Sequence, residues 1–242
     1  MSNGKHILFT GGNGLLGSEF KKIRPDVHYT GHADFDVTDY GQMSGYVRER
    51  GYDTIVHAAA FTSPPAIDKD PLKALWVNVV GTCNVVKLCM EFDMRMIYIC
   101  TDYVFKGDRG RYAETDPVYP VNKYAWSKLG GECAVRLYGK SLIVRTTFGP
   151  NVFPYEKAFV DQWTSRESVS TIARMISALI DTDATGTVHV GGARKTVYEF
   201  AKSLDPEKEI GELSIGDVGF AVPQDTSLDC GRYHELTQQL KS

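Results

Sequence analysis

The stretch Thr10-Gly11-Gly12-Asn13-Gly14-Leu15-Leu16-Gly17 decides how this chain of 242 residues folds. It follows a short apolar run at residues 5–9 and leads into a segment with helical periodicity at residues 15–23. Glycine permits a tight turn there, and the helix N-terminus that follows offers unsatisfied N–H groups to a pyrophosphate. Glycine-rich turns also occur without a ligand, but the apolar strand directly before this one favours a dinucleotide-binding turn.

Short apolar runs alternate with helical segments through the first 150 residues. Strands are predicted at residues 5–9, 27–30, 54–57, 96–100 and 142–144, and helices at residues 15–23, 40–50, 72–92 and 124–138. This alternation implies βαβ crossovers, which place helices on both faces of a parallel sheet. We therefore predict an α/β fold with a doubly wound, Rossmann-like parallel sheet.

The pattern changes in two places. Residues 106–122 are rich in Gly, Asp and Pro and are predicted to form a surface loop. After Pro150 we expect an irregular segment at 151–163, a helix at 169–180, a strand at 187–190 and a helix at 197–203. These elements are too few for a separate core. We thus expect a dinucleotide-binding domain at residues 1–150 and a small, reduced C-terminal substrate lobe at residues 151–242, not independently folded.

Composition excludes several classes of protein. Lys and Arg number 27 against 30 Asp and Glu, so the formal net charge of −3 gives no electrostatic footprint for nucleic acid. Five cysteines without a CxxC pair suggest neither a disulfide framework nor a zinc site. The polar N-terminus is followed by only a short apolar run, which predicts no signal peptide or membrane span. We expect a cytoplasmic protein without a membrane partner.

The end of the predicted second strand bears on which dinucleotide binds. An acid near this point usually reads the adenosine ribose of NAD. The strand here ends Tyr29-Thr30-Gly31-His32, without a carboxylate. The missing negative charge favours NADP(H) over NAD(H), although Asp34 or Asp36 could reach the ribose instead and would then favour NAD(H).

A second pair of residues suggests acid–base chemistry. Tyr124 and Lys128 are four residues apart, on one face of a predicted helix. A nearby ammonium favours phenolate and lowers a tyrosine pKa toward neutral pH, as the proton donor of a carbonyl reduction requires. Tyr and Lys are also common on helix surfaces. Their position after the fourth strand, where such a sheet carries its active crevice, supports the catalytic interpretation.

Three further features have both a functional and a structural interpretation. Thr101 ends the fourth strand, where its hydroxyl could hold a substrate carbonyl or simply cap a turn. His57 is followed by Ala58, Ala59 and Ala60, whose small side chains suit a flat cofactor or tight packing. Asn78 is a polar residue in an apolar helix; it could hold water near the site, but a structural bridge between helix and sheet is favoured.

Taken together, these residues resemble the extended short-chain dehydrogenase/reductase family, and more closely its dTDP-4-dehydrorhamnose reductase branch. The segments that carry the likeness keep the family's order: TGGNGLLG (10–17), DVTD (36–39), HAAAFT (57–62), NVVGT (78–82), TDYVF (101–105), YAWSK (124–128), RTTF (145–148), GTVHVGG (186–192), VYEFAK (197–202) and TSLD (226–229). The likeness covers most of the chain.

The resemblance implies a set of roles. Tyr124 is expected to donate the proton, Lys128 to lower its pKa and hold the nicotinamide ribose, and Thr101 to act as the hydroxyl partner. The substrate would meet Thr101, Asp102, Tyr103 and Phe148. The expected cofactor-binding residues, besides Tyr124 and Lys128, are Gly11, Asn13, Gly14, Leu15, Leu16, Gly17, His32, Asp36, Val37, Ala58, Ala59, Ala60 and Asn78. No metal site is implied.

The implied activity is reduction of a 4-keto nucleotide sugar by NAD(P)H, in deoxysugar or surface-glycan biosynthesis. Related 4,6-dehydratases carry a glutamate where this chain has Tyr103, which argues for a reductase. Two alternatives stay open: a nucleotide-sugar epimerase, and a non-catalytic regulatory subunit that binds dinucleotide. The family also includes dimers, so a homodimer is compatible with the likeness. The stretch between Phe148 and Asp161 is shorter than is usual in the family, which predicts the reduced substrate lobe.

Overall fold

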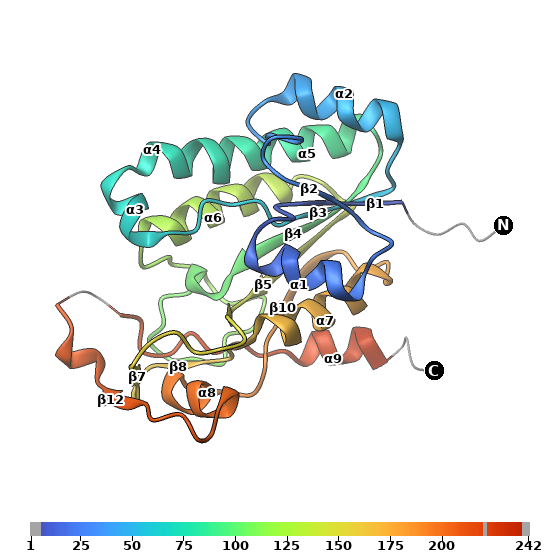
Figure 1. The fold of residues 1–242 in the computed structure, drawn as a ribbon. Helices are drawn as coiled ribbons and strands as arrows, with labels where there is room; N and C mark the ends of the chain where they lie inside the picture. The colour runs from blue at the N-terminus through green and yellow to red at the C-terminus, as the bar shows by residue number, and fades with distance from the viewer. Residues whose placement is uncertain (1–5, 220–221, 239–242) are drawn as a thin grey trace. The chain divides into compact units, whose positions relative to one another are not determined.

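The structure is a computed structural model that describes residues 6–219 and 222–238. Lys5, the first residue of the predicted first strand, and the polar N-terminus before it lie outside the described residues. Figure 1 shows a central sheet with helices on both faces. The sheet has the strand order β10-β5-β4-β3-β1-β2. Its strands are β1 (Ile7–Thr10), β2 (His28–Thr30), β3 (Thr54–His57), β4 (Arg95–Thr101), β5 (Ser141–Thr146) and β10 (Gly186–Val190).

The described helices are α1 (Leu15–Ile23), α2 (Tyr40–Arg50), α3 (Pro64–Lys69), α4 (Pro71–Ala74), the π-helix η1 (Leu75–Val80), α5 (Gly81–Glu91), α6 (Lys123–Val135), α7 (Val169–Ile180), α8 (Val197–Leu204) and α9 (Gly231–Gln238). Those predicted at 15–23, 40–50 and 169–180 have the predicted bounds, whereas α3 and α9 are not among the predicted helices. Short 3₁₀ segments lie at η2 (Asp102–Val104) and η3 (Ile215–Asp217). The predicted Rossmann-like α/β fold is confirmed.

The described chain forms two compact units, and it passes from one unit to the other several times. The first contains the residues up to Cys100, Asn122–Val144 and Asp183–Thr187. The second contains Thr101–Val121, Arg145–Thr182 and the residues from Val188 onward. The two units are therefore interleaved in sequence. A functional division at residue 150, into dinucleotide-binding and substrate-binding parts, stays a prediction.

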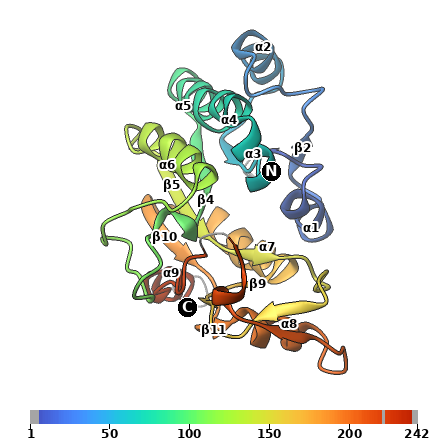
Figure 2. The ribbon, with the colours of Figure 1, turned by 90° about the vertical axis from the view of Figure 1, so that its left-hand side faces the viewer.

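In the first unit, β1 pairs in parallel with both β2 and β3, and β3 pairs in parallel with β4. All four residues of β1 and of β3 are buried, as expected for parallel strands covered on both faces. Helices α2, α5 and α6 cover one face and α1 covers the other (Figures 1 and 2). Because the chain goes from β1 to β2 on one side and then to β3 on the other, the strand order reverses between β1 and β3. Ligands of open α/β sheets bind at such a switch point.

The helix predicted at 72–92 is one helical run with an interruption. A π-helical turn, η1, separates α4 from α5, and the Gly81 N–H bonds to the Trp76 carbonyl five residues earlier. π-Helical turns often mark functional sites. The run Pro71–Glu91 is long and apolar enough to cross a membrane by length and composition alone, a test that core helices also pass. Here Asn78, Val85 and Leu88 are buried inside the first unit.

The second unit departs most from the sequence-based prediction. The helix at 169–180 is confirmed, but the segment predicted to be irregular contains β7 (Lys157–Phe159) and the start of β8 (Trp163–Thr164). Each pairs with a distant strand: β7 with β12 (Gly211–Leu213), and β8 with β11 (Lys195–Thr196). A third pair joins β6 (Phe148–Gly149) to β9 (Glu167–Ser168). Strands of two or three residues are too short to show an alternating hydrophobic pattern. Their pairing partners also lie far along the chain, so the local sequence does not reveal them.

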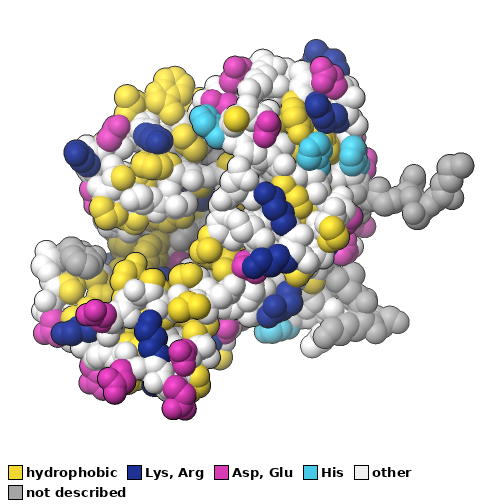
Figure 3. Space-filling model, viewed as in Figure 1, with side chains coloured by type: hydrophobic (Ala, Val, Ile, Leu, Met, Phe, Trp, Pro, Cys, Tyr) yellow, Lys and Arg dark blue, Asp and Glu magenta, His cyan; other side chains and the backbone are white. Residues whose placement is uncertain are grey.

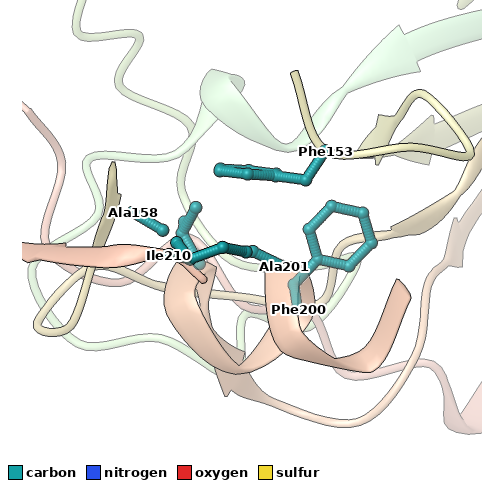
Figure 4. Close-up of a cluster of buried hydrophobic side chains, with 6 residues drawn as sticks. Phe153, Ala158, Phe200, Ala201 and Ile210 are labelled. Carbon is teal, nitrogen blue, oxygen red and sulfur yellow. The ribbon is translucent and has the colours of Figure 1, made fainter. Parts of the chain in front are cut away.

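This unit has a hydrophobic cluster of its own (Figure 4). Phe153 and Ala158 pack there with side chains from α8 and the segment after it, namely Val197, Phe200, Ala201 and Ile210. The cluster holds the β7–β12 pair against α8. The loop predicted at 106–122 has no regular strand or helix, which confirms that prediction.

Candidate functional site

The glycine turn lies at the switch point between β1 and β3. Gly11 has φ +75°, a conformation that favours glycine, and a Cβ atom there would lie 2.8 Å from the Ala59 amide nitrogen. A Cβ atom on Gly17 would lie 2.6 Å from the Gly12 Cα. Gly12 N–H donates to the Thr30 carbonyl at 2.9 Å, which ties the turn to β2. The glycines therefore permit the tight turn that the sequence predicts and the close approach of backbone to backbone, whereas their contact with a pyrophosphate stays a prediction.

The turn fits a diphosphate group. Helix α1 begins after Gly14, which offers no side-chain cap, so the first amides of α1 have no capping side chain. An uncapped helix N-terminus with glycine before it attracts a phosphate through its N–H groups and its dipole. Leu16 is buried beneath this turn, whereas Asn13 and Leu15 are exposed on it. A nicotinamide dinucleotide therefore fits the residues present.

The residues expected near the adenosine lie after β2. His32 is exposed, and its Nδ1 lies 3.6 Å from the Asp36 carboxylate. Asp36 accepts hydrogen bonds from the Thr38 N–H and hydroxyl at 2.9 and 2.8 Å, so it is engaged in its own turn. Val37 is buried and lies against Gly81, where a Cβ atom would be 2.7 Å from the valine Cγ2.

A buried histidine connects β1, β3 and α5. His57 Nδ1 and the Thr10 hydroxyl are 2.9 Å apart, and His57 Nε2 lies 3.1 Å from the Thr82 hydroxyl. The Thr10 hydroxyl in turn accepts a bond from the Ala59 N–H at 3.2 Å. Burial lowers the pKa of His57 to about 3, and the Lys128 charge adds to this effect, so the ring is neutral. His57 holds the Ala58–Ala60 segment against the glycine turn.

The predicted acid–base pair stands on α6 in the same unit. Tyr124 is half-buried and Lys128 is buried one turn later. The Lys128 Nζ lies 4.3 Å from the centre of the Tyr98 ring, within cation–π range, and the Tyr98 hydroxyl donates to the Lys128 carbonyl at 2.9 Å. Burial lowers the pKa of Lys128 to about 8, against smaller raising effects of Cys100 and Glu132. The lysine therefore still carries its charge at neutral pH.

Thr101, Asp102, Tyr103 and Phe148 belong to the second unit. The Thr101 hydroxyl donates to Asp102 Oδ1 at 3.2 Å and accepts from the Tyr103 N–H at 3.3 Å, which caps η2. Thr226 donates to Asp102 Oδ2 at 2.7 Å. Burial raises the pKa of Asp102 to about 6, although the Thr226 hydrogen bond and the Arg166 charge oppose the rise. The carboxyl group is poised to change protonation near neutral pH.

The remaining polar groups of this cluster are Gln162, directly before β8, and Arg166, between β8 and β9. Arg166 and Gln162 both interact with Tyr103, whose pKa burial nevertheless raises. The Arg166 Nε is buried without a hydrogen-bond partner among the described residues. Phe148 begins β6 and pairs in register with Glu167. The structure thus gathers Asp102 and Tyr103 with an arginine that the sequence did not single out.

Sequence reasoning missed Tyr98, Ser127, Arg166 and Thr226. Tyr98 is one apolar-looking residue of a buried strand, and Arg166 lies in a stretch without periodicity. Thr226 was noticed only as part of a family-like segment, with no role attached. Ser127 stands between Tyr124 and Lys128 and could have been found by asking what fixes that helix turn.

The sequence matches the RmlD substrate binding domain family over residues 5–160. It is 28% identical to a methionine adenosyltransferase 2 subunit beta from Bos taurus, over 96% of this chain and 82% of that protein. It is 30% identical to a dTDP-4-keto-6-deoxy-D-glucose reductase from Streptomyces niveus, over 81% of this chain and 76% of the relative.

The fold comparison agrees with the sequence comparison. A dTDP-4-dehydrorhamnose reductase from Bacillus anthracis, solved in complex with NADP, superposes with a TM-score of 0.85 at 25% identity, covering 100% of both chains. A hypothetical dTDP-4-dehydrorhamnose reductase from Sulfolobus tokodaii gives a TM-score of 0.83 at 27% identity, over 96% of this chain and 94% of the other. The glycine turn, the Tyr124–Lys128 pair and the extent of these matches lead to one conclusion: this chain belongs to the RmlD substrate binding domain family, with an extended short-chain dehydrogenase/reductase fold.

Proposed function

We propose that this protein is an NAD(P)H-dependent reductase of a 4-keto nucleotide sugar that serves deoxysugar or surface-glycan biosynthesis. The observation that carries the proposal is the buried Lys128 ammonium, held over the Tyr98 ring one helical turn after Tyr124. The same unit contains the uncapped glycine turn, which suits a dinucleotide. Relatives named as reductases of dTDP-linked keto sugars support this substrate class.

The chemistry divides between cofactor and protein. When bound, the reduced nicotinamide supplies a hydride to the carbonyl carbon. Tyr124 gives its phenolic proton to the developing alkoxide, and the Lys128 ammonium stabilises the phenolate that remains. Because the pKa of Lys128 is about 8, the ammonium is present at neutral pH and is lost in mild alkali. We assign the Thr101 hydroxyl to hold the substrate oxygen.

The sugar-facing roles are assigned to the second unit. Asp102 is buried and accepts hydrogen bonds from two hydroxyl groups, which fix the orientation of its carboxyl group. Tyr103 stands where a water-eliminating relative would need a carboxylic acid, and the raised pKa of its phenol makes it a poor acid. Phe148 offers an aromatic surface to the sugar. These features favour plain reduction over dehydration.

We propose NADP(H) as the preferred cofactor. The Asp36 carboxylate accepts two hydrogen bonds from Thr38, and the His32 imidazole is exposed. The imidazole is therefore available to bind a 2′-phosphate. Titration of the protein with NADPH and NADH tests this preference. Tighter binding of NADPH is expected, and tenfold tighter binding of NADH would contradict it.

A second candidate is a regulatory subunit that binds dinucleotide without turnover. The similarity to a methionine adenosyltransferase subunit over 96% of this chain favours it. Against it, Thr101, Tyr124 and Lys128 are all retained, and Lys128 keeps its aromatic support.

One experiment separates these functions. The protein is incubated with each reduced cofactor and a panel of 4-keto nucleotide sugars, while cofactor oxidation and product isomers are followed. Oxidation supports the reductase, an isomer without net oxidation indicates an epimerase, and cofactor binding with no product indicates the regulatory subunit. In the reductase, Tyr124→Phe should lower kcat ~10²–10⁴-fold and leave cofactor affinity nearly unchanged. Wild-type turnover in that variant would exclude the mechanism.

We further propose that the protein is cytoplasmic and forms a homodimer through an apolar surface of the first unit. Figure 3 shows hydrophobic side chains gathered over α4 and α6. More than half of each side chain is exposed for Leu72 of α4, Leu75 and Trp76 of η1, and Trp126 of α6. Exposed apolar patches on a protein surface often mark protein–protein interfaces. Sedimentation of wild type and Trp126→Glu tests it: a wild-type monomer would exclude the dimer, and loss of a dimer in the variant would locate the interface.

A further inference from the structure

The side chain of Asn78 is fully buried at the centre of the π-helix η1, and its amide is engaged on three sides. Its Nδ2 donates to the Phe61 carbonyl at 2.9 Å and to the Ser127 hydroxyl at 2.8 Å. Its Oδ1 accepts from the Phe61 N–H at 2.7 Å. The backbone N–H of Phe61 must meet an acceptor, which fixes the orientation of the amide. Both amide hydrogens are therefore committed to the protein.

Ser127 continues this connection into the helix that carries the acid–base pair. Its hydroxyl receives the bond from Asn78 and donates its own proton to the Tyr124 carbonyl at 2.7 Å. A serine has one O–H donor, so the two bonds are compatible only in this direction. The hydroxyl thus joins Asn78 to the first turn of α6.

The packing around this contact is tight. A Cβ atom on Gly131 of α6 would lie 2.7 Å from the Asn78 carbonyl oxygen. That carbonyl also accepts from the Thr82 hydroxyl at 2.8 Å, and Thr82 contacts His57. The π-helical turn is therefore hydrogen-bonded to α5, to the segment after β3 and to α6. A buried amide with all of these partners is costly to displace, since each lost bond leaves an unsatisfied group.

We propose that Asn78 and Ser127 form a brace that positions Tyr124 relative to the Ala58–Phe61 segment. Both are positioning residues: they act through the backbone of Phe61 and Tyr124. The catalytic consequence rests on the proposed function, but the brace itself does not. If the segment after β3 lines the nicotinamide, the brace sets the distance between the cofactor and the Tyr124 hydroxyl. Misplacement by about 1 Å can cost ~100-fold in rate.

The test compares Ser127→Ala, Asn78→Ala and the double variant. Ser127→Ala is expected to lower kcat ~tenfold with NADPH affinity within about twofold, because the tyrosine moves and the glycine turn does not. The double variant should be no worse than Asn78→Ala, since a brace already broken at one end has nothing more to lose. Effects that multiply in the double variant would overturn the coupling. Ser127→Thr, which retains the hydroxyl, should recover most of the activity.

Amide hydrogen exchange supplies a readout that needs no substrate. Exchange at Phe61 should accelerate in Asn78→Ala, which removes the acceptor of the Phe61 N–H, and to a smaller extent in Ser127→Ala, which loosens the Phe61–Asn78 bond. The matched control is Ser203→Ala: Ser203 makes the same bond to the carbonyl three residues earlier, at 2.7 Å to Phe200, and its variant should leave Phe61 exchange unchanged. Unaltered Phe61 exchange in Ser127→Ala would overturn the brace. Absence of any wild-type turnover would instead count against the proposed function, and the exchange result would still decide the brace.

Discussion

The glycine turn of the first unit and the tail segment Asp225–Leu228 of the second both consist mainly of loop backbone held in a fixed shape, but they are fixed in opposite ways. The turn is shaped by glycines within eight consecutive residues, by the hydrogen bond of Gly12 to β2 and by the close contact of Gly11 with Ala59 after β3. The tail segment is held by residues more than sixty positions away: Thr226 bonds Asp102, Ser227 accepts from the Arg111 N–H, and Leu228 donates to Ser165. The shape of the turn depends on residues that are neighbours in the sequence, whereas the shape of the tail segment depends on residues that only folding brings close.

The two regions also differ in how they respond to pH. His57, which ties the turn to β3, is buried as a neutral ring with a pKa of about 3. Asp102, which the tail holds, has a pKa of about 6. A fall in pH is therefore expected to lower the stability of the region around His57, whereas a rise in pH lowers the stability of the region around Asp102.

Gly17→Ala should break the turn. Its Cβ would lie within 2.7 Å of the backbone of Gly11 and Gly12, which cannot move without losing the bond to β2. We expect a loss of about 3 kcal/mol in the free energy of unfolding, and NADPH affinity lowered ~100-fold or more. Urea unfolding and a cofactor titration measure both. The control is Gly45→Ala in α2, where no atom lies within 4 Å of the added carbon; it should stabilise by about 0.5–1 kcal/mol. Equal effects of the two substitutions would contradict the steric argument.

His57→Gln should remove the acid sensitivity of the first region. The folded pKa is about 3, against 6.5 for a free histidine, so the wild type has its full stability above pH 6.5 and loses it as the pH falls. The loss by pH 4 amounts to about 3 kcal/mol. The difference in unfolding free energy between wild type and variant should shrink by this amount between pH 7 and pH 4. Parallel pH curves would show that His57 titrates normally.

Asp102→Asn should have the opposite pH signature. The folded pKa of about 6 exceeds the unfolded value of 3.8, so the protonated form is stabilised and the wild type loses stability as the pH rises from 4 to 7. The loss is about 2 kcal/mol, and an amide at this position avoids it. Relative to the wild type, the variant should therefore gain stability across this range in urea unfolding. A constant difference would mean that the carboxyl group ionises as in water.

Thr226→Val tests the long-range contact itself. The valine fills nearly the same volume but cannot donate to Asp102 Oδ2, so the free energy of unfolding at pH 7 should fall by about 1.5 kcal/mol. Under the proposed function, KM for the sugar should rise while NADPH affinity stays constant. Thr226→Ser retains the hydroxyl and should recover most of the loss. A change in NADPH affinity as large as that in KM would show that the tail segment affects cofactor binding as well as substrate binding.

Much of the fold could be predicted because its signals are local. The helices at 15–23, 40–50 and 169–180 have the predicted bounds, and β3 matches the predicted strand at 54–57. Their apolar periodicity and glycine punctuation lie within each segment. The short strands around Trp163 and Lys195 could not be predicted, because each is defined only by its pairing with the other. The π-helical turn at Asn78 could not be predicted either, because the partners of the Asn78 side chain, Phe61 and Ser127, lie far from it in the sequence.

Local sequence accounts for the alternation of strands and helices, the glycine turn and the spacing of Tyr124 and Lys128, because each depends on residues within a few positions of one another. The groups around them are brought there by folding: the Tyr98 ring beneath the lysine, the Asn78–Ser127 brace and the Thr226 bond to Asp102. Protonation states were decided there too. A pKa depends on burial and on charges brought close by folding, and neither is written in the order of the residues.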